Sequence, residues 1–453
     1  MKYHIITLGC QMNMSDSERT QPVIERLGYQ WTDREEEADL LGIIACSVRQ
    51  KAIDKVYSRI YKWNKSKNHR NLITFISGCI LPDDRKKFLK LFDIVFPMSE
   101  LNQLPDMIRQ YGINTPAGLH QAQAIQAVGR QAKKLKLNAH INEFWNVAPQ
   151  YVSSFEAFVP IQNGCDKFCT YCAVPYTRGR EISRPSGDIL AEVQSLIDKD
   201  YKSITILGQN VNSYGLDKKG KEISFARLLA EIGEMGLKSG KEFWVYFTSP
   251  HPRDMTDDVL ETVARYPHLG KQIHIPVQAG DDEVLRRMNR KYDIAHYRKI
   301  IHSIWRLLPE ATVFTDIIVG FNGETNEAFE RTREILREFH FDMAYIAQYS
   351  QRPGAKAAEW EDDVTVHEKK RRYHILTQDL TEISTRQIAR LKGKTLRVLV
   401  RGMERKGEYL SGLTEGKINV RILSADQSLT GKIINVKITE TGEFSVAGKI
   451  VIQ

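Results

Sequence analysis

The chain has 453 residues, of which 42% are hydrophobic and 27% are charged. These values are ordinary for a folded globular protein and exclude an intrinsically disordered chain. At about 150 residues per domain, the length predicts roughly three domains. The net charge of +9 favours a polyanionic partner.

The N-terminus and the lengths of the apolar runs indicate the cellular compartment, and the compartment in turn indicates the role of the cysteines. The first residues, MKYHIITLGCQMN, lack the pattern of a signal peptide. No apolar run approaches the roughly 20 residues that cross a bilayer, so we expect a cytoplasmic protein. In a reducing compartment, six cysteines are better explained as metal ligands or catalysts than as disulfides.

Residues 1–112 alternate apolar, β-branched runs with helical patterns. Strand–helix alternation with nearly continuous apolar strands is typical of a parallel sheet that is covered on both faces. We therefore expect an N-terminal α/β domain with a doubly wound parallel sheet. The expected strands are 3–10, 39–47, 72–79 and 93–97.

The first three of these strands end in Cys10, Cys46 and Cys79. The carboxyl ends of parallel strands meet at one edge of a sheet, where ligands bind. Three buried small residues are one interpretation, since free cysteine is often part of a core. The recurrence at the same place favours a three-cysteine metal site. Zinc could use it, but a 4Fe-4S cluster with one non-cysteine ligand fits better.

Residues 113–157 lack strong periodicity and are predicted to be a linker. The alternating pattern then resumes over 158–385. Six β-α units predict a partial TIM-type (β/α)6 barrel, with the chemistry on the loops that follow the strands. The expected strands are 158–165, 203–210, 243–250, 271–280, 312–321 and 343–350.

The stretch GCDKFCTYC places Cys165, Cys169 and Cys172 at the spacing C-x3-C-x2-C, and no fourth cysteine follows. Iron–sulfur clusters and structural zinc sites normally take four protein ligands, so three ligands leave one position open to substrate. A zinc knuckle that lacks its fourth ligand is the alternative. The stretch resembles the signature of the radical S-adenosylmethionine (SAM) superfamily. That resemblance implies a 4Fe-4S cluster whose open iron binds SAM and cleaves it to methionine and a 5′-deoxyadenosyl radical.

Motifs along nearly the whole chain resemble the methylthiotransferase family, and within it the tRNA-2-methylthio-N6-dimethylallyladenosine synthases. In that family the three N-terminal cysteines hold a second 4Fe-4S cluster. Ala45, Asn322 and Gln351 depart from the usual motifs, which affects local loop geometry and removes no ligand. The matching motifs are LGCQMN (8–13), ACSVRQKA (45–52), SGC (77–79), GCDKFCTYCAVPYTRGREISRP (164–185), LGQNVNSYG (207–215), TSPHP (248–252), IPVQAGDDEVLRRMNR (275–290), DIIVGFNGET (316–325) and RPG (352–354).

Five further residues are candidates for binding the cofactor. Gln209 and Asn210, at a strand end, contact SAM or satisfy loop amides. Arg178, close to the cluster cysteines, is expected to reach a phosphate or the SAM carboxylate, with an ordinary solvated side chain as the alternative. Histidines 251, 274 and 296 are interpreted as structural. The complete candidate set is Tyr171, Arg178, Gln209, Asn210 and Gly320, the last in a strand and turn that resemble the one lining the adenine of SAM.

In residues 386–453 the sequence pattern changes to short strands separated by Gly, Ser and Asp turns, which predicts a small β-barrel. This segment carries 13 lysines and arginines against 6 aspartates and glutamates, a net +7. A basic small barrel is typical of nucleic-acid binding, although an ordinary solvated β surface is the alternative. The segment resembles a TRAM domain, which binds tRNA in this family.

Together the resemblances imply an enzyme that inserts sulfur at C2 of an adenosine and methylates that sulfur. The implied substrate is tRNA carrying N6-isopentenyladenosine immediately 3′ of the anticodon, and two SAM molecules are used. The implied cofactors are two 4Fe-4S clusters and SAM, and an electron donor and a sulfur source are also needed. Two alternatives stay open: a sister methylthiotransferase acting on threonylcarbamoyl-adenosine in tRNA or on a ribosomal-protein aspartate, and a non-catalytic zinc-dependent RNA-binding protein.

Overall fold

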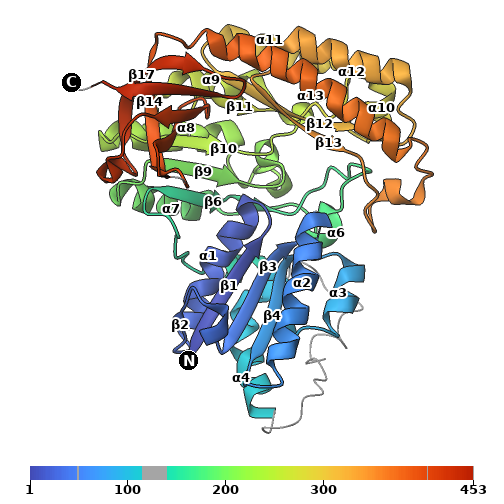
Figure 1. The fold of residues 1–453 in the computed structure, drawn as a ribbon, viewed down its shortest axis with the longest axis vertical. Coiled ribbons are helices and arrows are strands. Elements are labelled where there is room, and N and C mark those ends of the chain that lie inside the picture. Colours follow the sequence, from blue (N-terminus) through green and yellow to red (C-terminus); the bar gives the residue numbers. More distant parts are fainter. Residues whose placement is uncertain (48–49, 115–139, 406, 452–453) are drawn as a thin grey trace.

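The computed structural model describes residues 1–47, 50–114, 140–405 and 407–451. In Figure 1 the N-terminal sheet lies below, the central strands and their helices lie above it, and the C-terminal β-barrel packs against one end of the central part. In the described part of the chain, no helix is both long and apolar enough to cross a membrane.

The N-terminal sheet has five parallel strands in the order β2-β1-β3-β4-β5. One face packs on α1, α4 and α5, and the other packs on α2 and α3. Such coverage explains why β3 is buried along its entire length. The strands are β1 (Lys2–Leu8), β2 (Gln30–Trp31), β3 (Leu40–Cys46), β4 (Ile73–Cys79) and β5 (Ile94–Val95); the helices are α1 (Gln11–Glu25), α2 (Gln50–Ser66), α3 (Pro82–Phe88), α4 (Leu104–Asn114) and α5 (Ile141–Trp145).

The predicted linker over 113–157 lies partly outside the described residues. Its described part contains α5, whose Ile141, Phe144 and Trp145 are buried in the core of the N-terminal domain. This short helix was not expected from the sequence, because five residues are too few to show a helical period.

The central strands form two parallel three-stranded sheets, β10-β9-β6 and β11-β12-β13. A parallel bridge between Val245 and Leu269 connects them, so the six strands follow one another as in a partial barrel. The α/β class and the partial barrel that the sequence predicted are confirmed. The strands are β6 (Glu156–Pro160), β9 (Ser203–Leu207), β10 (Trp244–Phe247), β11 (Gln272–His274), β12 (Thr312–Val319) and β13 (Met343–Gln348), and a small ribbon adds β7 (Gln162–Asn163) and β8 (Ile182–Ser183).

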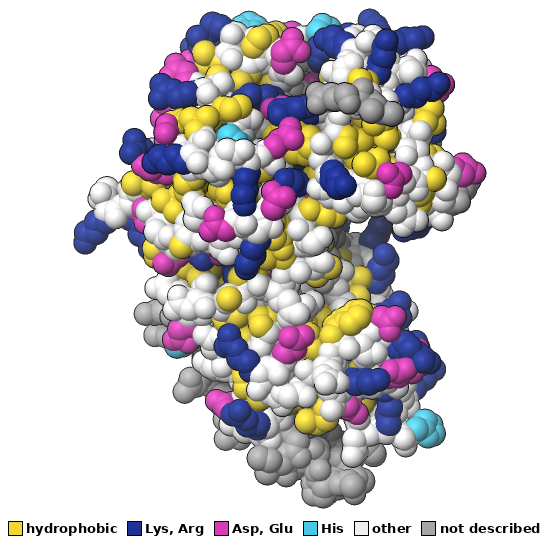
Figure 2. Space-filling view, turned by 90° about the vertical axis from the view of Figure 1, so that its left-hand side faces the viewer, with side chains coloured by type: hydrophobic (Ala, Val, Ile, Leu, Met, Phe, Trp, Pro, Cys, Tyr) yellow, Lys and Arg dark blue, Asp and Glu magenta, His cyan; other side chains and the backbone are white. Residues whose placement is uncertain are grey.

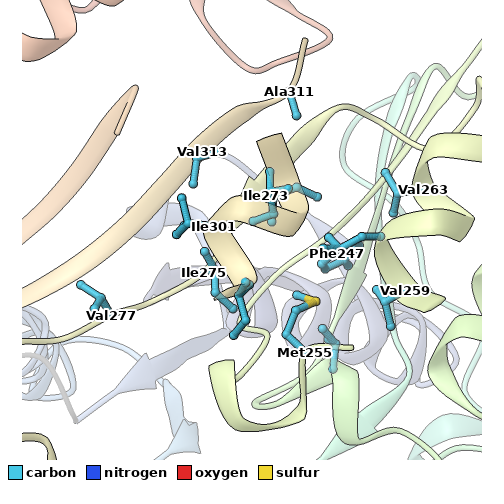
Figure 3. Close-up of a cluster of buried hydrophobic side chains, with 14 of the residues drawn as sticks. Phe247, Met255, Val259, Val263, Ile273, Ile275, Val277, Ile301, Ala311 and Val313 are labelled. Carbon is cyan, nitrogen blue, oxygen red and sulfur yellow. The ribbon is translucent and has the colours of Figure 1, made fainter. Parts of the chain in front are cut away.

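Helices cover the outer face of this partial barrel and share one core with it. Figure 3 shows Val259 and Ile301, from α9 and α11, near Phe247, Ile273 and Ile275. The core is therefore continuous across the junction of the two sheets. The helices are α6 (Val174–Arg178), α7 (Ser186–Asp198), α8 (Phe225–Ser239), α9 (Asp257–Arg265), α10 (Asp282–Arg287), α11 (Ile294–Leu307), α12 (Asn326–Phe339) and α13 (Val366–Ala389).

The C-terminal strands close into a barrel in the order β14-β15-β16-β18-β17, as the sequence predicted. Leu399 packs on Trp244 and Tyr246, so this barrel covers the β10 side of the central part. Arg397 and Arg401 pair with Glu242 and Glu156 there. The strands are β14 (Thr395–Met403), β15 (Leu410–Thr414), β16 (Asn419–Ile422), β17 (Ile433–Thr441) and β18 (Ser445–Ile450).

Candidate active site

The loop between β7 and β8 carries Cys165, Cys169 and Cys172. Its start is fixed because the Cys165 backbone N–H donates to the Gly179 carbonyl over 3.2 Å. Gly164 has φ +80°, and a Cβ there would lie 2.1 Å from the Arg180 carbonyl oxygen. Only glycine therefore lets the chain pass this closely before the first cysteine.

The three thiols of this loop lie close enough to influence one another. Burial raises the pKa of Cys165 to about 12, and the neighbouring Cys169 adds to the rise. Burial likewise raises the pKa of Cys172 to about 12, with Cys169 again contributing. Three buried thiols become thiolates together only when a positive centre compensates their charge, so this donor set suits an iron–sulfur cluster.

Arg290, three residues after the end of α10, provides one positive charge beside this loop. Its Nη1 donates to Cys169 Sγ over 3.3 Å and to the Tyr171 hydroxyl over 3.4 Å. The Tyr171 ring meets Phe321 edge-on. The sequence contained Arg290 within a matching motif but gave no reason to assign it a role, because 121 residues separate it from Cys169.

Unpaired polar atoms gather where the strands of the partial barrel end. Among the described residues, the buried atoms Gln209 Oε1, Asn210 Oδ1 and His251 Nε2 have no hydrogen-bond partner. Leaving a buried polar atom unpaired costs about 1–3 kcal/mol. A group of such atoms at the carboxyl ends of barrel strands indicates a polar ligand, which fits the expectation that Gln209 and Asn210 bind SAM. Gln162 Oε1, Glu181 Oε2 and Gln278 Oε1 share this property.

His251 was interpreted as structural, yet its ring is placed to bind. Its Nδ1 accepts from the Arg253 backbone N–H over 3.2 Å, so in the neutral ring Nε2 carries the proton. Burial lowers the pKa of His251, and the cations Arg290, Lys167 and Arg253 lower it further. The ring is therefore a neutral donor whose Nε2–H has no acceptor among the described residues.

A polar network connects the strand ends to the cysteine loop. Lys167, between the first two cysteines of that loop, forms a buried ion pair with Asp254. Asn210 Nδ2 donates to Asp254 over 3.1 Å and to Ser213 Oγ over 2.8 Å. Ser249 and Gln278 have φ of +59° and +73° after β10 and β11. Backbone strain of this kind concentrates at functional sites.

Gly320, expected beside the adenine of SAM, sits in a left-handed turn after β12 with φ +70°. Its N–H donates to Glu324 Oε2 over 2.6 Å. A Cβ at this position would lie 2.3 Å from Lys369 Cγ. Glycine is therefore needed here because the Lys369 side chain from α13 lies against it. The contact of Gly320 with adenine stays a prediction.

Cys10, Cys46 and Cys79 meet at the carboxyl edge of the N-terminal sheet. Cys46 and Cys79 are direct partners in the β3–β4 register. Asn13 accepts from the Cys10 backbone N–H over 3.2 Å, and its amide donates to Cys79 Sγ over 3.9 Å. A hydrogen bond with Cys46 and burial raise the pKa of Cys79, and burial together with Cys79 raises the pKa of Cys10. The three thiols form a second set of sulfur donors.

Within the described ranges, no three His, Cys, Asp or Glu side chains are arranged as ligands of a single metal ion. The donor chemistry of the two cysteine sets suits a cluster rather than a single ion. Each offers three soft sulfur ligands, the type that holds iron–sulfur clusters.

Arg178 lies away from its expected place. We expected it to reach the SAM carboxylate or a phosphate. Its guanidinium is buried between α6 and the N-terminal sheet, where it contacts Asp16 and Cys79. Although burial alone would lower the pKa of Arg178, Asp16 and Cys79 hold that pKa above its ordinary value. The sequence could not reveal this partnership, because 162 residues separate Arg178 from Asp16.

Comparisons with known proteins were consistent with this arrangement. Residues 159–336 match the model of the radical SAM superfamily, and residues 2–97 match one described as an uncharacterized protein family, UPF0004. The tRNA-2-methylthio-N(6)-dimethylallyladenosine synthase of Clostridium botulinum (strain Hall) is 38% identical, over 99% of this chain and 96% of the relative. The chain belongs to the radical-SAM methylthiotransferase family. The synthase of the same name from Carboxydothermus hydrogenoformans is 36% identical over 99% of both chains.

Solved structures support the fold. The radical S-adenosylmethionine methyltransferase TsrM from Kitasatospora setae, with tryptophan and a SAM analogue bound, matches with a TM-score of 0.53 at 11% identity. The match covers 78% of this chain and 75% of that one. A second TsrM structure, with cobalamin and a [4Fe-4S] cluster, matches with a TM-score of 0.52 at 12% identity, over 79% of this chain and 77% of that one.

The protein is therefore a radical-SAM methylthiotransferase whose cofactors are SAM and 4Fe-4S clusters. The residues at hand fit both. The six free cysteines offer sulfur atoms in two sets of three, and the unpaired donors and acceptors at the strand ends suit the polar groups of SAM.

Removing one of the unpaired polar atoms, the Gln209 acceptor or the His251 donor, should weaken SAM binding. We expect Gln209→Met and His251→Phe each to raise the Kd for SAM about tenfold, which corresponds to about 1.4 kcal/mol. Equilibrium dialysis with anaerobically reconstituted protein measures this change. The matched control is Gln194→Met, the same replacement at an exposed position of α7 where the side chain bonds Asp198. Equal affinities in all three variants would contradict the role of these atoms.

Proposed function

We propose that this enzyme converts N6-isopentenyladenosine, immediately 3′ of a tRNA anticodon, to 2-methylthio-N6-isopentenyladenosine. The observation that carries the proposal is the meeting of two three-cysteine sets at one interface, with Arg178 between them. In the net change the C2–H bond of the adenine is replaced by C2–S–CH3. The hydrogen atom leaves on 5′-deoxyadenosine formed from one SAM, and a second SAM provides the methyl group. A sulfur source and an electron donor complete the balance.

Two sets of residues hold the clusters in this proposal. Cys165, Cys169 and Cys172 hold the cluster that binds SAM, and Cys10, Cys46 and Cys79 hold the auxiliary cluster associated with sulfur. When bound, the SAM-binding cluster would supply the electron that cleaves SAM, and with it a carbon radical able to react at an aromatic C–H. Arg290 compensates the thiolate of Cys169, and Tyr171 bonds Arg290 beside the loop.

The strand-end residues orient SAM and exclude water. The His251 Nε2–H is a fixed neutral donor, and Gln209 and Asn210 present acceptors from the same edge. Lys167 and Asp254 neutralise each other and keep the cysteine loop tied to the loop after β10. These groups are held before SAM binds, so they need little rearrangement.

The C-terminal barrel supports an RNA substrate through two opposed lysines. Lys437 of β17 and Lys449 of β18 are direct cross-strand partners, and both are exposed. Like charges directly opposite each other destabilise a sheet, and a bound phosphate backbone removes that cost. Figure 2, viewed from the side of this barrel in Figure 1, shows lysine and arginine side chains spread over the upper part of the face.

Charge removal at this pair should change the salt dependence of tRNA binding. In Lys437→Gln/Lys449→Gln we expect the slope of log K against log salt to fall by about 2, because each phosphate contact contributes about 0.9. The control is Lys221→Gln/Lys238→Gln, which removes two exposed charges beside and on α8. Deletion of the barrel is a poorer test, since it would uncover Trp244 and Tyr246. Equal slopes in both double variants would remove the barrel pair from the RNA surface.

The substrate is tested by offering the reconstituted enzyme three candidates under anaerobic conditions with SAM, sulfide and a reductant. These are tRNA with isopentenyladenosine, tRNA with threonylcarbamoyl-adenosine, and the ribosomal protein with the aspartate. We expect a methylthio product, detected by mass spectrometry, from the first alone. The isopentenyl group favours an apolar pocket, worth about 0.8 kcal/mol per buried CH₂. A product from either other substrate instead would reassign the enzyme within its family.

A further inference from the structure

Arg178 is attached to both cysteine sites at once. On the backbone side, the carbonyl of the next residue, Gly179, accepts from the Cys165 N–H over 3.2 Å. The Arg178 carbonyl itself accepts from Asn163 Nδ2 over 3.0 Å, just ahead of the same loop. These two bonds tie the backbone at Arg178 to the loop with the SAM-site cysteines.

On the side-chain side, the guanidinium contacts buried groups. Nε donates to Cys79 Sγ over 3.0 Å. Nη1 donates to Asp16 Oδ1 over 3.2 Å and to Asn163 Oδ1 over 3.3 Å, and Nη2 pairs with Asp16 Oδ2. Arg178 is only 4% exposed. A buried fork bonded to a carboxylate has little freedom to rotate, so its Nε–H is held toward the sulfur.

The carboxylate that holds this fork is itself fixed in the N-terminal domain. Asp16 is fully buried on α1 and also accepts from Asn13 Nδ2 over 3.3 Å. Asn13 in turn contacts both Cys10 and Cys79. The chain of contacts therefore runs from the SAM-site loop through Arg178 to two of the three N-terminal cysteines.

We propose that Arg178 is a positioning residue that fixes the spacing of the two cysteine sites and raises the reduction potential of the cluster held by Cys79. The inference rests on the proposed function, in which Cys79 is a ligand of the auxiliary cluster. A positive N–H donor bonded to a ligand sulfur stabilises the cluster with one more electron, because reduction adds negative charge close to the donor. The auxiliary cluster is then reduced more easily than its three thiolates alone would allow.

Two variants separate this effect from simple damage to the interface. Arg178→Lys keeps a positive charge, but one ammonium group cannot reproduce the planar fork to Asp16 together with the bond to sulfur. Arg178→Gln/Asp16→Asn removes both charges, so that neither partner is left buried and unpaired. The matched control is Arg180→Lys, two residues further on, whose side chain pairs with Asp166 and is 74% exposed.

The experiment is a reductive titration of the reconstituted full-length enzyme, followed by electron paramagnetic resonance, with iron counted in each sample. Addition of SAM changes the signal of the cluster held by Cys165, Cys169 and Cys172, so the signal that does not change belongs to the auxiliary cluster. In Arg178→Gln/Asp16→Asn we expect the auxiliary cluster to be about tenfold harder to reduce, a shift of about 59 mV for one electron. Arg178→Lys should shift in the same direction by less, and Arg180→Lys should not shift.

Each outcome decides a separate question. An unchanged auxiliary potential with full iron in both Arg178 variants overturns the inference and leaves the proposed function intact. Loss of the auxiliary iron in both variants also overturns it, because Arg178 would then serve assembly rather than potential. A wild-type enzyme with a single cluster contradicts the proposed function itself.

Discussion

Replacement of Cys169 by alanine is expected to reduce SAM cleavage to background. Cys169 is the middle ligand of its loop, and two remaining thiolates do not retain a cubane against solvent. We expect iron to fall from about eight to about four atoms per chain, since one of two four-iron clusters is lost. The yield of 5′-deoxyadenosine under reducing conditions, with iron counted in the same sample, measures both effects.

Cys79→Ala is the matched control for this variant. It removes one thiolate from the other set and leaves the loop 165–172 and its contact with Arg290 intact. We expect 5′-deoxyadenosine from Cys79→Ala at a rate close to that of the wild type. If Cys169→Ala still released 5′-deoxyadenosine, the assignment of the radical chemistry to this loop would be wrong.

The sheets were predictable because their strands are nearly continuous apolar runs. β3 is buried at every position, so its sequence shows no alternation and indicates a strand covered on both faces. The same reasoning predicted that the carboxyl ends of β1, β3 and β4 bring three cysteines to one edge, and the Cys46–Cys79 register shows this for two of them. Features that depend on strand order and on local hydrophobic periodicity can therefore be predicted from the sequence.

Partners across long sequence separations could not be read in this way. Nothing near Arg178 in the sequence distinguishes a SAM-binding arginine from one that crosses to Asp16. His251 was interpreted as structural because a lone histidine in a loop usually is. The unpaired Nε2, which favours a binding role, depends on contacts that the sequence does not show. The net charge of the C-terminal barrel likewise could not show which of its cationic side chains pair with acidic residues elsewhere. Arg397 and Arg401 contribute to that charge, yet both face acidic residues of the central part.

Replacement of the three N-terminal cysteines should separate SAM cleavage from methylthiolation. Cys10→Ala/Cys46→Ala/Cys79→Ala should lose about half of the iron, because one of two four-iron clusters has no ligands left. Methylthio product should fall below detection. Reductive cleavage of SAM should continue, since Cys165, Cys169 and Cys172 come from a different part of the chain and keep their own contacts.

The triple variant needs a control that shows whether its N-terminal domain is still folded. Alanine preserves the small size of residues that lie at the ends of β3 and β4, and the apolar cores on both faces of the sheet contain none of the three cysteines. Thermal unfolding should therefore show the N-terminal domain still folded, and a tRNA affinity close to that of the wild type would confirm that the substrate still binds. Unchanged iron in the variant would return these cysteines to ordinary core packing. Product formed without them would mean that the sulfur reaches C2 by a route that does not involve this edge of the sheet.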